Sequence, residues 1–333
     1  MAVNENLAHA SNMLVYSAML VYTGALGAYV TDLAARGRPR VAEAVEVPVA
    51  VGAGAPADAD LPAQAPADGE LPADGAPSGW RTKAGGIGVS LTALAFLLHD
   101  GGVLARGLAV QRVPWGNMYE FSVAGSMIVT GVFLVVLARR DVRYLGTFVV
   151  GPVLLTLGLA VSVFYTQAAQ LVPALHSFWL VIHVSVAFVA SALYTLGFST
   201  TVLQLVQERR EAARAAGREP RGGRFMDALS GSAALDRSSY SLHVAAFPLW
   251  TFTVLAGAIW AESAWGRYWN WDPKETWSFV IWVVYAGHLH ARATRGWDGR
   301  KAAYFALAGY ACILMNFMVV NMVFVGKHSY GGL

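Results

Sequence analysis

The sequence predicts an all-α polytopic membrane protein with about eight transmembrane helices, an external tryptophan-rich loop and both termini external. Composition, the length of the apolar runs and the placement of basic residues support this prediction. Of the 333 residues, 56% are hydrophobic and only 14% are charged, and the mean hydropathy is +0.47. A water-soluble chain of this length is not so apolar. The net charge of +3 is therefore attributed to loops that set membrane orientation, not to nucleic-acid binding.

Apolar runs of about 20 residues have the length needed to cross a hydrocarbon core about 30 Å thick. The runs predict helices near residues 11–31, 84–106, 118–138, 144–165, 178–206, 240–261, 275–293 and 302–325. No basic residue precedes the first run and no small-residue cleavage pattern follows it. We therefore expect a retained helix there instead of a cleaved signal peptide.

Basic residues gather in every second connection between these runs. Cytoplasmic loops carry an excess of lysine and arginine, so these connections are predicted to be cytoplasmic. They contain Arg36, Arg38, Arg40, Arg81, Lys83, Arg139, Arg140, Arg143, Arg209, Arg210, Arg214, Arg218, Arg221, Arg224, Arg292, Arg295, Arg300 and Lys301. Arg106 and Arg112 lie in a predicted external connection, but the basic residues of the predicted cytoplasmic connections outnumber them. The tryptophan-rich loop and both termini are then external.

Two of the predicted cytoplasmic segments are long, and they differ in composition. Residues 36–83 include a long stretch rich in Ala, Pro, Gly and acids, with few large apolar residues, which predicts a disordered linker between the first helix, 1–35, and the remainder, 84–333. Residues 207–238 are rich in arginine and are expected to form a helical extension followed by a flexible turn. The single cysteine, Cys312, and the absence of CxxC or CxxCH exclude an intrachain disulfide, a thiolate metal cluster and covalently attached c-type haem.

Residues 260–278, the Trp-rich segment, read WAESAWGRYWNWDPKETWS. Tryptophan at this density either anchors a protein at the bilayer surface or forms a flat aromatic floor for a flat ligand. An interfacial belt spreads its tryptophans over many helix ends, whereas these share one predicted external loop, which favours a ligand platform. The candidate platform residues are Trp265, Trp269, Trp271 and Trp277.

Asp272, Pro273 and Glu275 predict the start of a helix. Aspartate is a good N-cap, proline suits the first helical position, and a glutamate three residues after the cap can reach back to it. The cap accounts for these side chains structurally and also fixes how the preceding tryptophans are aimed. Asp272 therefore stays among the candidate site residues.

Histidines beside predicted spans are the second functional signal, because ionisable residues there are rare and usually functional. His183 lies just inside the external end of the fifth span, and His328 lies just past the external end of the eighth. Both fall at the depth of the Trp-rich segment. Two imidazoles facing each other across an aromatic floor could hold a haem iron.

The remaining histidines are weaker candidates. His290 stands near the cytoplasmic end of its helix, as either a ligand of a second haem or a polar residue at a helix end. His288 lies two residues from it, so at most one of the two points into the bundle. The others are expected to be packed or exposed: His9, His99, His176 and His243.

The residues carry a resemblance to a known family. PWGNMYEF (114–121), SFWLVIHV (177–184), the long stretch 247–282, LHAR (289–292) and GKHSYG (326–331) resemble the CcsA/ResC type of cytochrome c biogenesis protein, called CcsB in actinobacteria. This is the WWD-domain, haem-handling family of system II. The insert after the first helix departs from that pattern.

The resemblance implies a set of roles. His183 and His328 correspond to external ligands of haem b, bound transiently as a substrate, and His290 to the membrane-embedded ligand. Residues 84–333 correspond to a haem-handling core in the plasma membrane that presents haem for thioether attachment to the CxxCH of apocytochrome c. The implied partners are a ResB-type membrane subunit, which would act with this chain as a cytochrome c haem lyase, and a thioredoxin-like reductant. Without that subunit, a second ligand for an inner haem is missing.

Three alternatives remain at this point. A haem exporter would release haem without taking part in its covalent attachment to apocytochrome c. A b-type cytochrome subunit would place paired histidines on facing helices at the same depth. A non-catalytic scaffold would use the tryptophans only as a membrane anchor.

Overall fold

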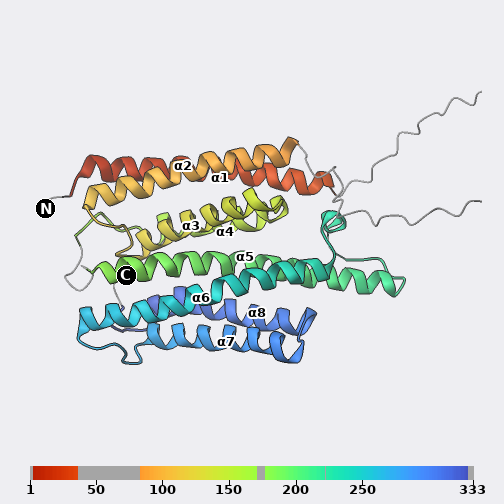
Figure 1. Cartoon of the computed structure of the whole chain (residues 1–333). Helices are drawn as coiled ribbons and strands as arrows, with labels where there is room; N and C mark the ends of the chain where they lie inside the picture. Colours follow the sequence, from red (N-terminus) through yellow and green to blue (C-terminus); the bar gives the residue numbers. More distant parts are fainter. Residues whose placement is uncertain (1–2, 37–82, 171–176, 222, 329–333) are drawn as a thin grey trace, which may run out of the picture.

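The computed structural model describes residues 3–36, 83–170, 177–221 and 223–328, and these residues are helical with no strand. The predicted linker at 36–83 therefore lies almost entirely outside the described residues. Figure 1 shows the helices as a bundle. The elements are α1 (Glu5–Arg36), α2 (Lys83–Val110), α3 (Met118–Arg139), η2 (Arg143–Leu145), α4 (Gly146–Ser162), α5 (Phe178–Ala215), η4 (Arg224–Ala228), α6 (Ser232–Trp265), α7 (Pro273–Arg295), α8 (Gly299–Leu314), η5 (Met315–Val319) and α9 (Val320–Val323).

The long helices correspond one by one to the predicted apolar runs. Seven spans in the described part of the chain are long and apolar enough to cross a membrane, α8, η5 and α9 counting together as one. The eighth helix, α7, has 23 residues and a length of about 35 Å, but its polar ends make it less apolar. The prediction of an all-α polytopic membrane protein is confirmed.

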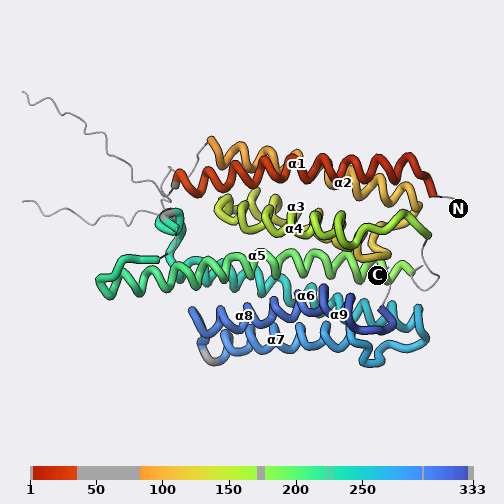
Figure 2. The backbone as a smooth tube through the Cα atoms, turned by 180° about the vertical axis from the view of Figure 1, so that it is seen from behind, coloured from red at the N-terminus to blue at the C-terminus, as the bar shows by residue number. Residues whose placement is uncertain are grey.

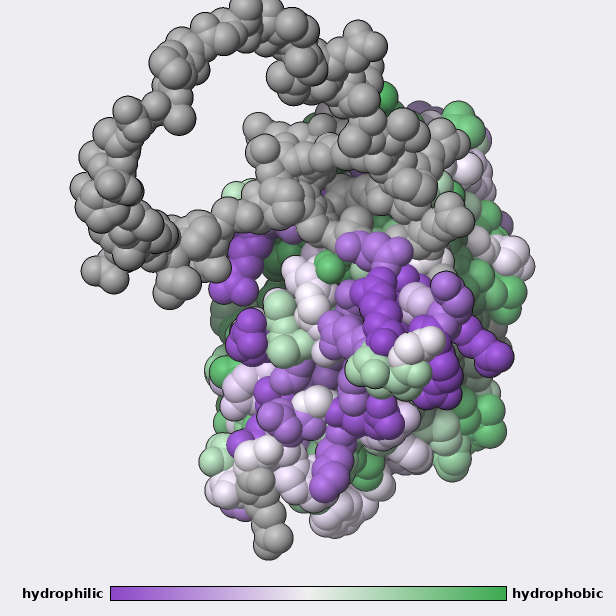
Figure 3. Space-filling model, turned by 90° about the vertical axis from the view of Figure 1, so that its right-hand side faces the viewer, coloured by the Kyte–Doolittle hydropathy of each residue, from purple (hydrophilic) through white to green (hydrophobic). Residues whose placement is uncertain are grey.

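The helices run up and down, so connections alternate between two ends of the bundle (Figures 1 and 2). The start of α1, the α6–α7 connection and the end of α9 lie at one end, here called the tryptophan end. The extension of α5 and the η4 turn lie at the other, the arginine end. Seen from the arginine end, hydrophilic residues gather on the end face (Figure 3). This is the arrangement that the alternating basic connections predict; which end faces the cytoplasm stays a prediction.

Helix α1 packs closely along α2. Ser11 Oγ donates a hydrogen bond to the Gly102 carbonyl at 2.7 Å, and Tyr29 is 1% exposed with its hydroxyl 3.2 Å from Thr92 Oγ1. Small residues let two helix backbones approach in this way. The first helix is therefore part of the bundle.

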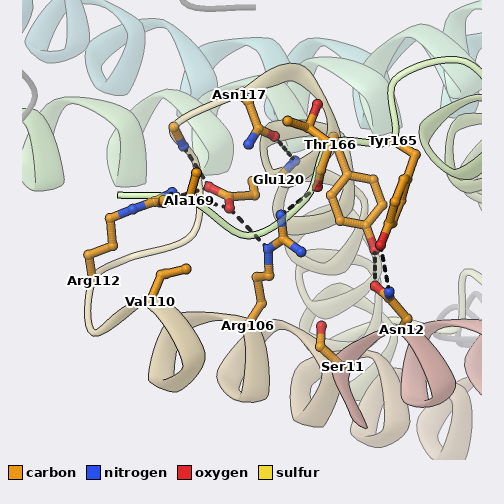
Figure 4. A network of polar contacts seen from close by, with 12 residues as sticks. Ser11, Asn12, Arg106, Val110, Arg112, Asn117, Glu120, Tyr165, Thr166 and Ala169 are labelled. Carbon is orange, nitrogen blue, oxygen red and sulfur yellow. Dashed lines mark hydrogen bonds and ion pairs between the residues drawn. The ribbon is translucent and has the colours of Figure 1, made fainter. Parts of the chain in front are cut away.

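A buried carboxylate ties the tryptophan ends of the first helices together (Figure 4). Glu120 on α3, whose side chain is 0% exposed, accepts from Arg106 Nε at 3.0 Å and from Arg112 at 2.8 Å. The same arginines donate to the carbonyls of Thr166 and Ala169. These contacts fix the segment after α4 against the α2–α3 connection, at the end of the bundle where the candidate site lies. Pairing explains why Arg106 is buried despite its charge.

Candidate functional site

The connection between α6 and α7 is held at both ends by helix caps. Helix α6 ends with Gly266 in the left-handed region, φ 72°, where glycine has no Cβ to clash. Helix α7 begins with Asp272 as N-cap, a proline at its first position and a complete capping box with Glu275. The predicted helix start is confirmed.

The capping glutamate also orders the connection itself. Glu275 Oε2 accepts from the backbone N–H of Asn270 at 2.8 Å and of Asp272 at 3.1 Å. Between them Trp271 has φ 57°, a strained value for a residue with a side chain. A backbone bonded on both sides can hold this conformation.

His183 of α5 is anchored through one ring nitrogen. Its Nδ1 lies 2.8 Å from the Thr253 carbonyl of α6, and because a carbonyl can only accept, Nδ1 carries the proton. A neutral imidazole protonated at Nδ1 has a lone pair at Nε2. The ring approaches α6 at Gly257, where an added Cβ would lie 2.7 Å from His183 Cε1. The side chain is thus oriented with Nε2 available.

His328 is anchored in the same way by a carboxylate. Its Nδ1 lies 2.9 Å from Asp272 Oδ1, and the other Asp272 oxygen accepts the backbone N–H of Lys327. Burial raises the pKa of the Asp272 carboxyl, but the hydrogen bonds from His328 and Lys327 outweigh this effect and leave the pKa below its usual value. Asp272 is therefore an anion at neutral pH. A histidine that donates one ring N–H to a carboxylate or carbonyl is the usual arrangement of a metal-ligating histidine.

Trp260 lies beside both histidines. Its ring centroid is 6.1 Å from that of His183, with the planes 13° apart, and 5.5 Å from that of His328. Trp265 contacts His328 edge to face at 4.9 Å. Trp260 thus contacts both imidazoles, and Trp265 contacts one of them.

Both histidines line one cavity of about 560 Å³. Its walls come from α3, α4, α5, α6, α8 and the Trp-rich segment, and most of the lining is apolar. The volume lies within the range of cofactor sites. Trp269 and Lys274 also line it.

The predicted tryptophan floor divides into separate roles. Trp269 lines the cavity, and Trp265 packs behind His328. Trp271 is 65% exposed, and neither it nor Trp277 lines the cavity. The structure thus brings two of the four predicted platform tryptophans to the site, and Trp260 takes the central position.

The other described histidines lie apart from this cavity. His290 is exposed, whereas His288 is 2% exposed and faces the 1% exposed His243 across 5.3 Å between ring centroids. Neither nitrogen of His243 or His288 has a hydrogen-bond partner, so the expectation that His243 is packed is confirmed but it is not hydrogen-bonded. His99 is fully buried, His9 is exposed, and His176 lies outside the described residues.

Sequence reasoning missed three contributors: Thr253, Gly257 and Lys274. Thr253 and Gly257 act through a carbonyl and through a missing side chain, which leave no signature in a single sequence. Lys274 carried a signal, since it is a lone cation in the first turn of a spanning helix.

Sequence comparisons relate this chain to known proteins. The sequence model of the family described as "Cytochrome C assembly protein" matches residues 115–328. The chain is 34% identical over 286 residues to "Cytochrome c biogenesis protein CcsA" of Synechococcus elongatus, covering 74% of this chain and 87% of that protein. It is 33% identical over 276 residues to the protein of the same name from a Synechocystis species, covering 68% and 82%.

A solved structure shares the fold. "Cytochrome c Heme Lyase CcmF" superposes with a TM-score of 0.58 and 16% sequence identity, covering 95% of this chain. The chain spans about half, 47%, of that protein, so the likeness concerns the fold.

These matches establish a multi-pass membrane protein of cytochrome c biogenesis. They also bear out the resemblance that the Trp-rich segment carries. On these matches, the chain belongs to the cytochrome C assembly protein family and is of the CcsA type.

Proposed function

We propose that this chain holds haem b between His183 and His328 at the external face of the plasma membrane and presents it for thioether attachment to apocytochrome c. The observation that carries the proposal is the matched anchoring of the two imidazoles. Each is held through Nδ1, by the Thr253 carbonyl or the Asp272 carboxylate, so each offers Nε2 as a ligand. Both line the same cavity.

The donor set suits haem better than a bare ion. Among the described residues, no group of three or more His, Cys, Asp or Glu could hold a metal ion. A bare ion needs about four ligands, whereas haem iron brings four porphyrin nitrogens and needs only axial ones. The largely apolar cavity of about 560 Å³ suits a flat, apolar ring.

The chemistry needs little from the protein beyond position. Each apocytochrome thiol adds across one vinyl group, so that sulfur bonds to the carbon next to the ring and the thiol hydrogen goes to the terminal carbon. No oxidant is consumed, but the thiols must be reduced, which is the proposed task of a thioredoxin-like partner. His183 and His328 orient the ring, and orientation supplies most of the acceleration.

An inner haem would involve His290 and a second subunit. His290 is exposed at the arginine end of α7, so a haem bound there would lie on the outside of this chain. A ResB-type membrane subunit would then cover it and supply the second ligand. In this scheme haem enters from the cytoplasmic side near His290 and moves to the external site.

The test replaces the two anchored imidazoles. His183→Gly and His328→Gly should retain part of the bound haem with a shifted absorption spectrum, and should mature little cytochrome c. Added imidazole, which can occupy the vacated position, should restore some maturation. His9→Gly, at an exposed position, is the matched control and should behave as wild type.

Other outcomes would favour the alternatives. Normal maturation and an unchanged spectrum in both variants would refute the two-histidine site and leave the tryptophans as a membrane anchor. Haem loss without loss of maturation would indicate that this chain releases haem, as an exporter does, instead of holding it for attachment to apocytochrome c.

A further inference from the structure

Lys274 places an amine in the largely apolar cavity. It is the second residue of α7 and lines the cavity together with His183 and His328. Its Nζ donates to the Asn316 carbonyl at 3.0 Å and to Asn321 Oδ1 at 2.9 Å. Both acceptors are neutral oxygen atoms, so neither forms an ion pair with the amine.

The acceptors come from an irregular part of the last span. Residues Met315–Val319 form a π-helical turn, in which the Val320 N–H bonds to the Met315 carbonyl. Such turns are rare and occur often at functional sites. Here the turn belongs to the segment that supplies the Asn316 carbonyl and the Asn321 amide to Lys274, so the irregularity serves to position a cation.

The nearby carboxylates are already engaged. Asp272 bonds to His328 and to two backbone N–H groups, of Lys274 and Lys327, and Glu275 accepts two backbone N–H groups of the capped connection. Within the described ranges, no carboxylate lies within ion-pair distance of Lys274 Nζ. An ammonium has three N–H donors, and two are used. The third donor is left for a ligand.

A second donor in the same cavity is also unused. Trp269 lines the cavity, and its Nε1 is buried with no hydrogen-bond partner. A buried polar group without a partner costs free energy, so a ligand acceptor that meets it is favoured. Lys274 Nζ and Trp269 Nε1 are both donors, which suits an oxygen atom of a ligand, although the lining also holds an unpartnered acceptor, Asn316 Oδ1.

We infer that Lys274, assisted by the Trp269 indole N–H, forms a carboxylate subsite that binds a propionate of the haem. The inference rests on the proposed function and adds the orientation of the haem ring within the cavity. The propionates occupy one edge of the ring and the vinyl groups the opposite part. A propionate held at Lys274 therefore turns the vinyl groups to the side of the cavity away from α7, where the thiols must reach them.

The test compares two porphyrins on the full-length chain purified in detergent. Haem and haem dimethyl ester share the ring, the iron and the vinyl groups, but the ester lacks the propionate charges. Wild-type protein should bind haem about tenfold or more tightly than the ester, as a charge-assisted hydrogen bond predicts. Lys274→Met should bind both porphyrins with the affinity that wild type has for the ester, and its bis-histidine spectrum should be unchanged.

Three further variants separate charge from folding. Lys274→Arg, which keeps the charge, should keep the preference for haem, and Trp269→Phe, which keeps the ring but loses the N–H, should reduce it. Lys301→Met, at an exposed position, should bind as wild type. Equal affinity of wild type for the two porphyrins, or an unchanged preference in Lys274→Met, would overturn the subsite. Failure of wild type to bind either porphyrin would overturn the proposed function instead.

Discussion

Replacing Gly257 with alanine tests the anchoring of His183 without touching the histidine. The added Cβ would lie 2.8 Å from His183 Nδ1 and 2.7 Å from Cε1. Ordinary contacts of this kind begin at about 3.5 Å, so the ring must retreat by about 0.7 Å. Gly257 and Thr253 lie one turn apart on α6. A His183 ring that moves away from the new Cβ therefore also moves away from the Thr253 carbonyl.

The size of the effect follows from that movement. The bond from Nδ1 to the Thr253 carbonyl, now 2.8 Å, would lengthen to about 3.5 Å, where it no longer counts as a hydrogen bond. Loss of an outer partner of a metal-ligating histidine costs about 10–100-fold in affinity. We expect haem affinity to fall by this factor, while overpacking costs about 1–3 kcal/mol of stability.

The assay is a haem titration of the purified protein, followed by absorption. Gly27→Ala is the matched control, because an added Cβ there meets nothing within 4 Å, and alanine should if anything stabilise α1. A Gly257→Ala protein that binds haem with wild-type affinity and spectrum would refute the claim that the Thr253 carbonyl orients His183.

Three further expectations concern the rest of the chain. Deleting most of residues 41–80 and leaving a short flexible bridge should preserve cytochrome c maturation, because the composition of this insert cannot form a core; loss of maturation at normal protein levels would reveal a binding role. In a variant whose native cysteine is replaced, Arg218→Cys and Asn270→Cys should react with impermeant thiol reagents from opposite sides of the membrane, and reaction from one side would refute the topology. Glu120→Ala should destabilise the protein by about 3–5 kcal/mol, since it leaves buried arginines unpaired, whereas Asp141→Ala, in an exposed pair, should cost less than about 1 kcal/mol; equal thermal shifts in detergent would contradict this.

The sequence predicted the number of long helices well because each span needs its own apolar run. Helix ends were predicted less well. Helix α6 begins at Ser232, whereas the apolar run covers 240–261, since polar turns outside the hydrocarbon core carry no hydropathy signal. The helical extension expected in 207–238 is confirmed, because α5 continues to Ala215. The cap at Asp272 was predicted correctly because its residues are local.

Sequence reasoning could bring residues of the candidate site together only where their depth decides their position, and their role in binding haem stays a prediction. His183 and His328 fall at the same depth, and this can be counted along the chain. Which of two neighbouring histidines faces inward depends on the rotation of α7 about its axis, and the structure buries His288 and exposes His290. The position of Trp260 beside both imidazoles likewise depends on how α5 and α6 pack.

The two anchors of the site belong to different helices, and residues 266–271 join them. His183 is hydrogen-bonded to the backbone of α6, and His328 to the N-cap residue of α7, Asp272. The helix caps at both ends of the joining segment make it stiff. The length of this segment therefore sets the separation between the two imidazoles. Selectivity for a thin, planar ligand is then a property of the backbone spacing, and exchanging an exposed tryptophan such as Trp271 would alter it less than inserting a single residue.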